Sequence, residues 1–293
     1  MKNYNSKVDK WGGNVKKLKF LFPKIGSWFK TCAGKLTVLL LIFCLILLGI
    51  SFLPIFKTSS HLRDNFENIV IGIGTNIFGI IITVSFVQFI LDKQNEKEER
   101  IAEKEKIIRF YQIMSFRIEK YFQVFAQITT PLSVFSQQQD KYINPDFKFE
   151  DMQDLYFPCL LIVKSQHSAI SVFYSEERRI KNYMLRMLEN IDFKYYSNIQ
   201  NLLIAFVKQS EANDVRQAIL DYEKKIVDGK YLSKIISLQI ATNNVDDWVG
   251  QFESGKSKSN LINNFVILYR LLQKEFFLLT ELITQVKEIE GKR

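Results

Sequence analysis

The chain has 293 residues, of which 47% are hydrophobic and 14% aromatic. This composition is too apolar for an intrinsically disordered protein. The net charge of +9 is concentrated near the N-terminus, because residues 1–35 carry nine lysines and one aspartate, residues 36–91 are balanced, and residues 92–293 therefore carry only +1. A basic body that binds nucleic acid directly is excluded for the large C-terminal part.

Cysteine and histidine are scarce. Cys32, Cys44 and Cys159 are odd in number and widely spaced, which fits neither a disulfide framework nor a zinc site. His61 and His167 are the two histidines of the chain, so a histidine-rich metal site is excluded as well. We expect no metal and no cofactor.

The N-terminal arm, residues 1–35, is basic and amphipathic. Its apolar side chains recur at steps of four and three from Trp11 to Phe29, with an interruption at Pro23. Such a segment is expected to lie in the headgroup plane of an anionic bilayer. The alternative is a disordered tail that only sets the topology. The residues expected at the lipid surface are Trp11, Lys16, Lys17, Lys19, Lys24, Trp28 and Lys30.

Two uncharged apolar segments follow, residues 36–56 and 69–91. Each is long enough to cross a hydrocarbon layer of about 30 Å at about 1.5 Å per residue. The first lies behind an arm too long for a cleaved signal peptide. Together they predict a transmembrane hairpin, residues 36–91.

The second segment carries a stripe of small and polar residues, spaced three or four apart and therefore on one helix face. We refer to them as the small-residue stripe: Gly72, Thr75, Asn76, Gly79 and Thr83. Small side chains let membrane helices approach closely, and the polar ones can hydrogen-bond across the contact. The stripe is expected to form a helix–helix contact, either with the other span of the same chain or between copies.

Lysine and arginine number nine before the first span, two in the loop from Lys57 to Glu67, and six between Lys93 and Arg109. By the positive-inside rule, both termini are expected in the cytoplasm and the short loop outside. The prediction is a two-pass protein of the bacterial inner membrane.

Residues 92–128 are expected to form a charged stalk that continues as a helix, because eleven of the fifteen residues from Asp92 to Lys106 are charged. Residues 129–293 predict an all-α cytoplasmic domain. In it, Glu176, Glu177, Arg178 and Arg179 are expected on the solvent face of a helix over residues 169–190. Further helices are expected over 151–156, 195–207, 215–227, 231–241 and about 30 residues from Ser259, with residues 157–163 also helical rather than a strand.

One segment matches a chemical motif. Gly250 to Ser257 fits the phosphate-binding pattern G-x-x-x-x-G-K-[ST], but the preceding residues 243–249 are too polar for the buried strand that this motif requires. We expect an exposed loop between helices, with Ser257 or Ser259 capping the last helix. The adjacent His167 and Ser168 lack an orienting carboxylate and the glycines of a nucleophile elbow, so we expect no enzyme.

The order of basic arm, two-span hairpin, charged stalk and helical body resembles the two-transmembrane effectors of bacterial anti-phage systems, including those encoded beside retrons. The resemblance covers the whole chain as architecture and transfers no functional residue. It implies a toxin-like, abortive-infection role in which the spans damage the inner membrane once a phage trigger releases them.

Two functions therefore stay open. In the first, the chain is a membrane effector that a cytoplasmic protein or ribonucleoprotein partner holds inactive. Several copies of the chain can then form a homo-oligomer. In the second, it is a non-toxic membrane-tethered adaptor whose helical domain binds a partner protein.

Overall fold

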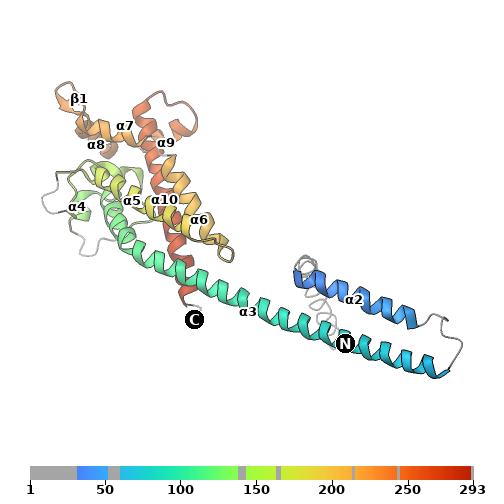
Figure 1. The fold of residues 1–293 in the computed structure, drawn as a ribbon. Helices are drawn as coiled ribbons and strands as arrows, with labels where there is room; N and C mark the ends of the chain where they lie inside the picture. The colour runs from blue at the N-terminus through green and yellow to red at the C-terminus, as the bar shows by residue number, and fades with distance from the viewer. Residues whose placement is uncertain are drawn as a thin grey trace, which may run out of the picture. The chain divides into compact units, whose positions relative to one another are not determined.

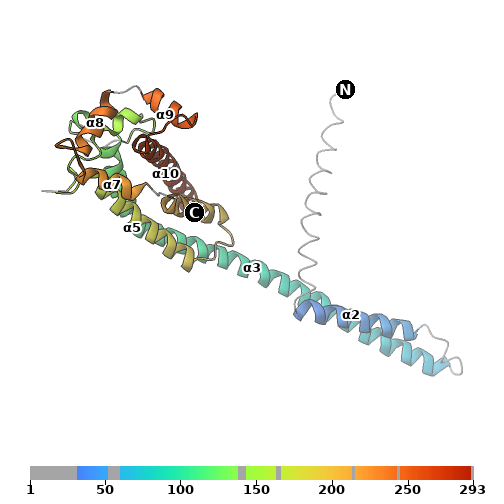
Figure 2. The ribbon, with the colours of Figure 1, turned by 90° about the horizontal axis from the view of Figure 1, so that it is seen from above.

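The computed structural model describes the backbone of residues 32–51, 60–137, 143–162, 166–212, 215–242 and 245–291. Two compact units divide the chain, unit 1 with residues Met1–Glu99 and unit 2 with residues Arg100–Arg293. Their helices are drawn in Figure 1 and, turned by 90°, in Figure 2. The division falls inside the range 92–128 that was predicted as a stalk and helix, so residues 100–128 belong to unit 2.

Unit 1 contains α2 (Cys32–Ser51) and the first part of α3 (Ser60–Ile128). The two helices lie side by side and run in opposite directions (Figures 1 and 2). By length and composition, the helical segment Asn68–Ile128 can cross a membrane, whereas the apolar stretch Thr37–Ile46 of α2 is shorter. At the end of the apolar part of α3 and just beyond it, Gln88 and Gln94 donate hydrogen bonds to the carboxylates of Asp92 and Glu98, one turn on, which supports the helix.

The described residues of unit 2 are mostly helical, with turns between the helices and one small hairpin, so the prediction of an all-α chain is confirmed for the described residues. After α3, its elements are α4 (Leu132–Phe135), the 3-10 helix η2 (Phe149–Asp154), α5 (Ala169–Asn190), α6 (Ser197–Glu211), α7 (Arg216–Lys224), β1 (Ile226–Val227), β2 (Lys230–Tyr231), α8 (Leu232–Thr242), α9 (Val245–Glu253) and α10 (Asn260–Gly291).

Helices α3, α5, α6 and α10 pack around a common aromatic core. The ring of Tyr121 lies 5.0 Å from that of Phe173, and the ring of Phe125 lies 5.4 Å from that of Phe276 and 5.6 Å from that of Phe147. All but Phe276 are buried. Aromatic pairs in these geometries add to the free energy gained by burying their area, so this core holds α3, α5 and α10 together.

Side chains set the ends of several helices. The Ser168 hydroxyl accepts a hydrogen bond from the Ser171 N–H at 3.4 Å at the start of α5, and Ser259 accepts one from the Ile262 N–H at 3.4 Å at the start of α10. The Asp154 carboxylate accepts the Leu132 N–H at 2.7 Å at the start of α4. These bonds satisfy N–H groups that have no partner inside the helix. The predicted capping of the last helix by Ser257 or Ser259 thus falls on Ser259.

Three predictions for unit 2 need correction. The helix expected to Val227 ends at Lys224, because β1 and β2 pair antiparallel across Asp228 and Gly229, whose φ angles of 50° and 75° belong to a tight hairpin turn. Residues 157–163 were expected to be helical but form turns with one isolated bridge, where they are described. Finally, an exposed loop was expected from Gly250 to Ser257, but its first residues belong to helix α9, which runs from Val245 to Glu253.

Candidate functional site

The described surface of α2 and of α3 as far as Leu91 is largely apolar. Large hydrophobic side chains are exposed on α2 and on α3 as far as Leu91, among them Phe43, Ile69, Phe78 and Phe86. In a water-soluble protein such side chains would be buried against other elements. The apolar surface of this part of α3 therefore requires a non-aqueous environment or a protein partner.

A few residues form the contact between α2 and α3. Val70 and Ile81 of α3 are buried, as is Cys44 of α2. The Cys44 Sγ lies 3.7 Å from the carbonyl oxygen of Gly74 and donates a weak hydrogen bond to it. Gly74 is buried at this contact, and it lies outside the predicted stripe.

The small-residue stripe lies mostly away from α2. Gly72 and Gly79 have open space where a Cβ atom would be, and Asn76 is exposed. The hydroxyl groups of Thr75 and Thr83 donate to carbonyl groups of their own helix, Thr75 to Ile71 at 2.9 Å and Thr83 to Gly79 at 2.9 Å. Among the described side chains, Thr75 is the member of the stripe that lines a small hollow with Cys44 of α2.

These positions correct one of the two expected uses of the stripe. Within the described residues, α2 packs on Gly74 and its neighbours rather than on Gly72 and Gly79, because those glycines face a different side of α3. The contact of the stripe with a helix of another copy stays a prediction. The lipid-surface residues Trp11, Lys16, Lys17, Lys19, Lys24, Trp28 and Lys30 lie outside the described residues.

The motif-like segment Gly250 to Ser257 has its backbone N–H groups committed to helix α9. The N–H groups of Lys256 and Ser257 both donate to the Gln251 carbonyl, at 2.9 and 3.0 Å, and that of Gly255 donates to Phe252 at 3.0 Å. A phosphate-binding loop instead directs these groups at its ligand. Here they close the C-terminus of α9, with Gly255 at φ +67°, a conformation common after a helix end.

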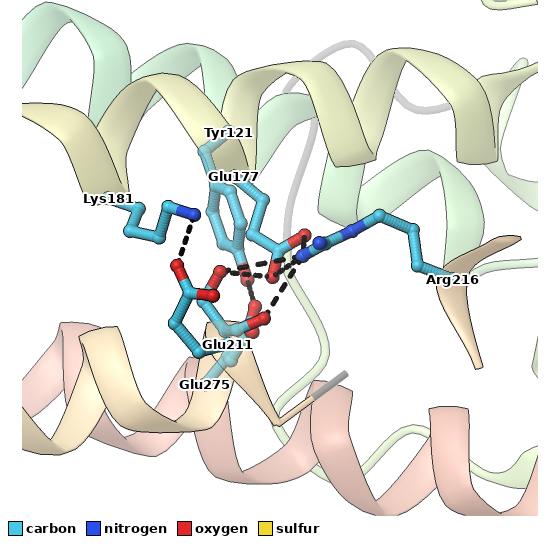
Figure 3. A network of polar contacts seen from close by, with 7 residues as sticks. Tyr121, Glu177, Lys181, Glu211, Arg216 and Glu275 are labelled. Atoms are coloured by element: carbon cyan, nitrogen blue, oxygen red, sulfur yellow. Dashed lines mark hydrogen bonds and ion pairs between the residues drawn. The ribbon is translucent and has the colours of Figure 1, made fainter. Parts of the chain in front are cut away.

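The most distinctive polar site lies inside unit 2, where two buried carboxylates meet (Figure 3). Glu177 of α5 accepts the Ser210 hydroxyl at 2.7 Å and two hydrogen bonds from the Arg216 guanidinium at 2.8 and 2.7 Å. Glu275 of α10 accepts the Tyr121 hydroxyl at 2.8 Å. Both glutamates are 0% exposed. We call Tyr121, Glu177, Ser210, Arg216 and Glu275 the buried carboxylate cluster.

Burial governs the protonation of this cluster. Loss of hydration, then repulsion by Glu177 and a hydrogen bond to it, raise the pKa of Glu275 well above its ordinary value. Burial, with the nearby Glu275, likewise raises the pKa of Tyr121. A single guanidinium cannot balance two carboxylates, so one of them keeps a proton. Glu177 is paired with the Arg216 guanidinium, and the raised pKa of Glu275 favours its protonated form.

The cluster brings together side chains of α3, α5, α6, α7 and α10, with one hydrogen bond between Tyr121 and Glu275 and a second set among Glu177, Ser210 and Arg216. Because both carboxylates are fully buried, a substrate has no direct access to them. Their role is structural, because the Arg216 guanidinium and the Ser210 and Tyr121 hydroxyl groups supply hydrogen bonds to the buried carboxylates. On its edge, Lys181 pairs with Glu211 at 2.5 Å and lowers the pKa of Glu211 (Figure 3).

The sequence pattern predicts Glu176 and Glu177 on a solvent face of α5, and the structure corrects this. Arg178 and Arg179 are exposed as predicted, but both glutamates are buried, Glu176 at 2% exposure. The sequence of α10 does contain a signal for a buried carboxylate. Glu275 stands three residues after Leu272 and four before Leu279, so it lies on the apolar face of the helix. A carboxylate at such a position requires a buried partner.

A polar pocket of about 430 Å³ lies elsewhere in unit 2, between α3, the start of α6 and the end of α10. Beside it, the buried Glu103 accepts the backbone N–H groups of Tyr195 and Tyr196 at 3.1 and 3.2 Å. This carboxylate already occupies the positive end of α6. The pocket is lined by Arg100, Ile101, Lys104, Tyr195, Tyr196, Ser197, Asn198, Ile199, Gln285, Glu288 and Ile289.

His167 is exposed at the start of α5, with its carbonyl accepting the Cys159 N–H at 3.0 Å. The neighbouring Ser168 donates its hydroxyl to Glu223 at 2.8 Å and caps α5, so this serine has a structural role. Comparison of the chain with protein-family models, with curated proteins and with solved structures finds no match.

Proposed function

We propose that this protein is a membrane effector of a bacterial anti-phage or toxin-like system. Its two apolar segments cross the inner membrane as a hairpin, with both termini in the cytoplasm. The spans of several copies assemble and perturb the membrane, and a cytoplasmic partner bound to unit 2 controls this assembly. The protein acts without catalysis, through its membrane segments.

The observation that carries the proposal is the outward apolar surface of α3. Exposed isoleucine, valine and phenylalanine side chains occur from Ile69 to Leu91, and no ionisable side chain interrupts them. The 24 residues from Asn68 to Leu91 extend about 36 Å along a helix, which exceeds the thickness of a hydrocarbon layer. A bilayer removes this surface from water.

The uncovered stripe supports assembly rather than anchoring alone. Packing of α2 leaves Gly72 and Gly79 with open space, at positions where the backbone of another helix can approach closely. Because lipid gives no hydrophobic gain for pairing helices, this close approach is the main way in which such spans associate. We therefore assign the stripe to the contact between copies.

Expression in a bacterium, with recording of membrane potential and growth, tests the proposal. The parent chain is expected to collapse the potential, whereas Ile80→Arg should abolish this, since arginine at mid-span costs about 2.5–3.5 kcal/mol on insertion scales. Ile80→Leu is the matched control and should act like the parent. An inserted parent chain that leaves potential and growth unchanged would contradict the effector and favour the adaptor.

Cysteine labelling tests the topology separately. Ser59→Cys should react with a membrane-impermeant reagent in intact cells, because the short loop lies outside by the distribution of lysine and arginine. Ser254→Cys in unit 2 should react only after the cells are opened. The reverse pattern would rule out the proposed orientation.

A further inference from the structure

On one side of unit 2, three cations converge on a single buried carboxylate. The Glu176 side chain is 2% exposed, and its carboxylate lies 2.7 Å from Arg179 Nη1, 3.5 Å from Lys120 Nζ and 3.7 Å from Arg117 Nη1. The side chains of the three cations are 48%, 33% and 30% exposed, respectively. Since one carboxylate neutralises one cation, two positive charges remain at this surface.

An exposed apolar pair lies next to these cations on α3. Phe116 is 67% exposed and Ile113 is 55% exposed. With Lys120 they follow each other at steps of three and four, so they occupy one face of the helix. The Arg117 guanidinium carbon lies 5.8 Å from the centre of the Phe116 ring, within the range of a cation–π contact. Aromatic and arginine side chains are enriched at protein–protein contacts.

We propose that this surface binds an acidic segment of a cytoplasmic partner protein. We call it the α3–α5 surface, and it consists of Ile113, Phe116, Arg117, Lys120 and Arg179. Carboxylate groups of the partner would balance the two positive charges that Glu176 leaves, and an apolar side chain would cover Phe116 and Ile113. The inference rests on the proposed function, which requires a controlling partner, and it adds the chemistry of that partner and the place where it binds.

The charge distribution favours a protein over a nucleic acid. Residues 92–293 carry a net charge of only +1, so the body lacks the extended excess of lysine and arginine that phosphate-backbone binding requires. The cations are instead confined around two apolar side chains. An apolar centre with charged groups around it is the arrangement of a protein–protein interface.

Fluorescence anisotropy with the full-length chain in detergent micelles tests the inference. The probe is a labelled synthetic peptide of 12 residues composed of aspartate, glutamate, leucine and phenylalanine. Phe116→Ala and Arg179→Gln should each weaken its binding by about tenfold, and added salt should weaken it further. Phe277→Ala and Lys274→Gln, which change exposed side chains of α10, serve as matched controls and should bind like the parent.

The same peptide with its carboxylates replaced by amides should bind far more weakly. Equal binding of parent and α3–α5 surface variants would overturn the inference, as would tighter binding of a 12-nucleotide uridine RNA that the same variants abolish. Because the assay needs no membrane damage, it can fail while the effector proposal stands. Conversely, unchanged membrane potential in cells would sink the effector proposal and leave the peptide result intact.

Discussion

The two units solve the problem of apolar side chains in opposite ways. In unit 1 the apolar residues of α3, such as Phe78 and Phe86, face outward and the helix contact is thin. In unit 2 the apolar residues form a buried aromatic core, and even carboxyl groups such as those of Glu177 and Glu275 are enclosed and accept hydrogen bonds. The contrast teaches that the stable placement of apolar side chains depends on the medium around each unit. In our proposal this medium is lipid for unit 1 and water for unit 2.

The largest expected effect concerns the buried charge of unit 2. Arg216→Ala removes the guanidinium that pairs with Glu177 at 2.7 Å and leaves a buried carboxylate without its counter-charge, which costs about 3–5 kcal/mol. Denaturant unfolding followed by tryptophan fluorescence measures the loss, since Trp248 is buried. The exposed Arg178→Ala is the matched control. Equal stability of the two variants would show that the cluster holds no buried charge.

The second prediction concerns the proton on Glu275. Its pKa is raised in the folded protein, so above the ordinary glutamate value of about 4.3 folding takes up a proton. The contribution of Glu275 to the free energy of unfolding is therefore complete below about pH 4.3. As the pH rises further, this contribution falls by at most about 1.4 kcal/mol per pH unit, until the pH exceeds the pKa of Glu275 in the folded protein.

Glu275→Gln keeps an uncharged side chain without a proton to lose. It should be more stable than the parent at pH 7, and it should lack this part of the pH dependence. Chemical denaturation between pH 4 and pH 8 measures both effects, with Glu119→Gln at an exposed position of α3 as the control. A variant that follows the pH profile of the parent would place the shared proton elsewhere.

In unit 1 a change of packing should act on assembly rather than on the fold. Gly79→Leu adds a bulky side chain where Gly79 has open space, so a single copy can accommodate it, but another helix could not approach closely. Crosslinked oligomers and membrane damage should both decrease severalfold, while Ile80→Leu is nearly silent. Normal insertion, oligomers and toxicity in Gly79→Leu would remove the stripe from the mechanism.

The smallest effect is expected at the surface of unit 2. Lys256 is exposed, and its backbone N–H rather than its side chain contributes to the end of α9. Lys256→Ala should change the unfolding free energy by less than about 0.5 kcal/mol. If the purified protein binds ATP with magnesium and this substitution abolishes the binding, the interpretation of the segment as a helix end is wrong.

Local sequence patterns predicted much of the helical structure but not its polar contacts. The apolar spacing of α5, α6, α8 and α10 and the turn at Asp228 and Gly229 are signals within a few residues. Helix α9 was not predicted, because its polar first residues were compared only with the pattern of a buried strand and not with that of a helix.

The buried carboxylate cluster could not be predicted because its partners are distant in the sequence. Glu177 meets Arg216 39 residues on, and Tyr121 meets Glu275 154 residues on. A run such as Glu176 to Arg179 is a solvent face in most amphipathic helices, and only the packing of other helices turns two of its members inward. The side of α3 that α2 covers was likewise undetermined, because small residues occur on more than one face.

The hairpin between β1 and β2 offers a place to attach a probe. Gly229 has open space around it, and Ile226 and Tyr231, which pair at the open end of the hairpin, are both exposed. Exposed turns of this kind tolerate insertions because they carry few contacts of the core. A short epitope or a fluorophore-binding tag inserted between Asp228 and Gly229 would therefore report on unit 2 in living cells while leaving the aromatic core and the α3–α5 surface unaltered.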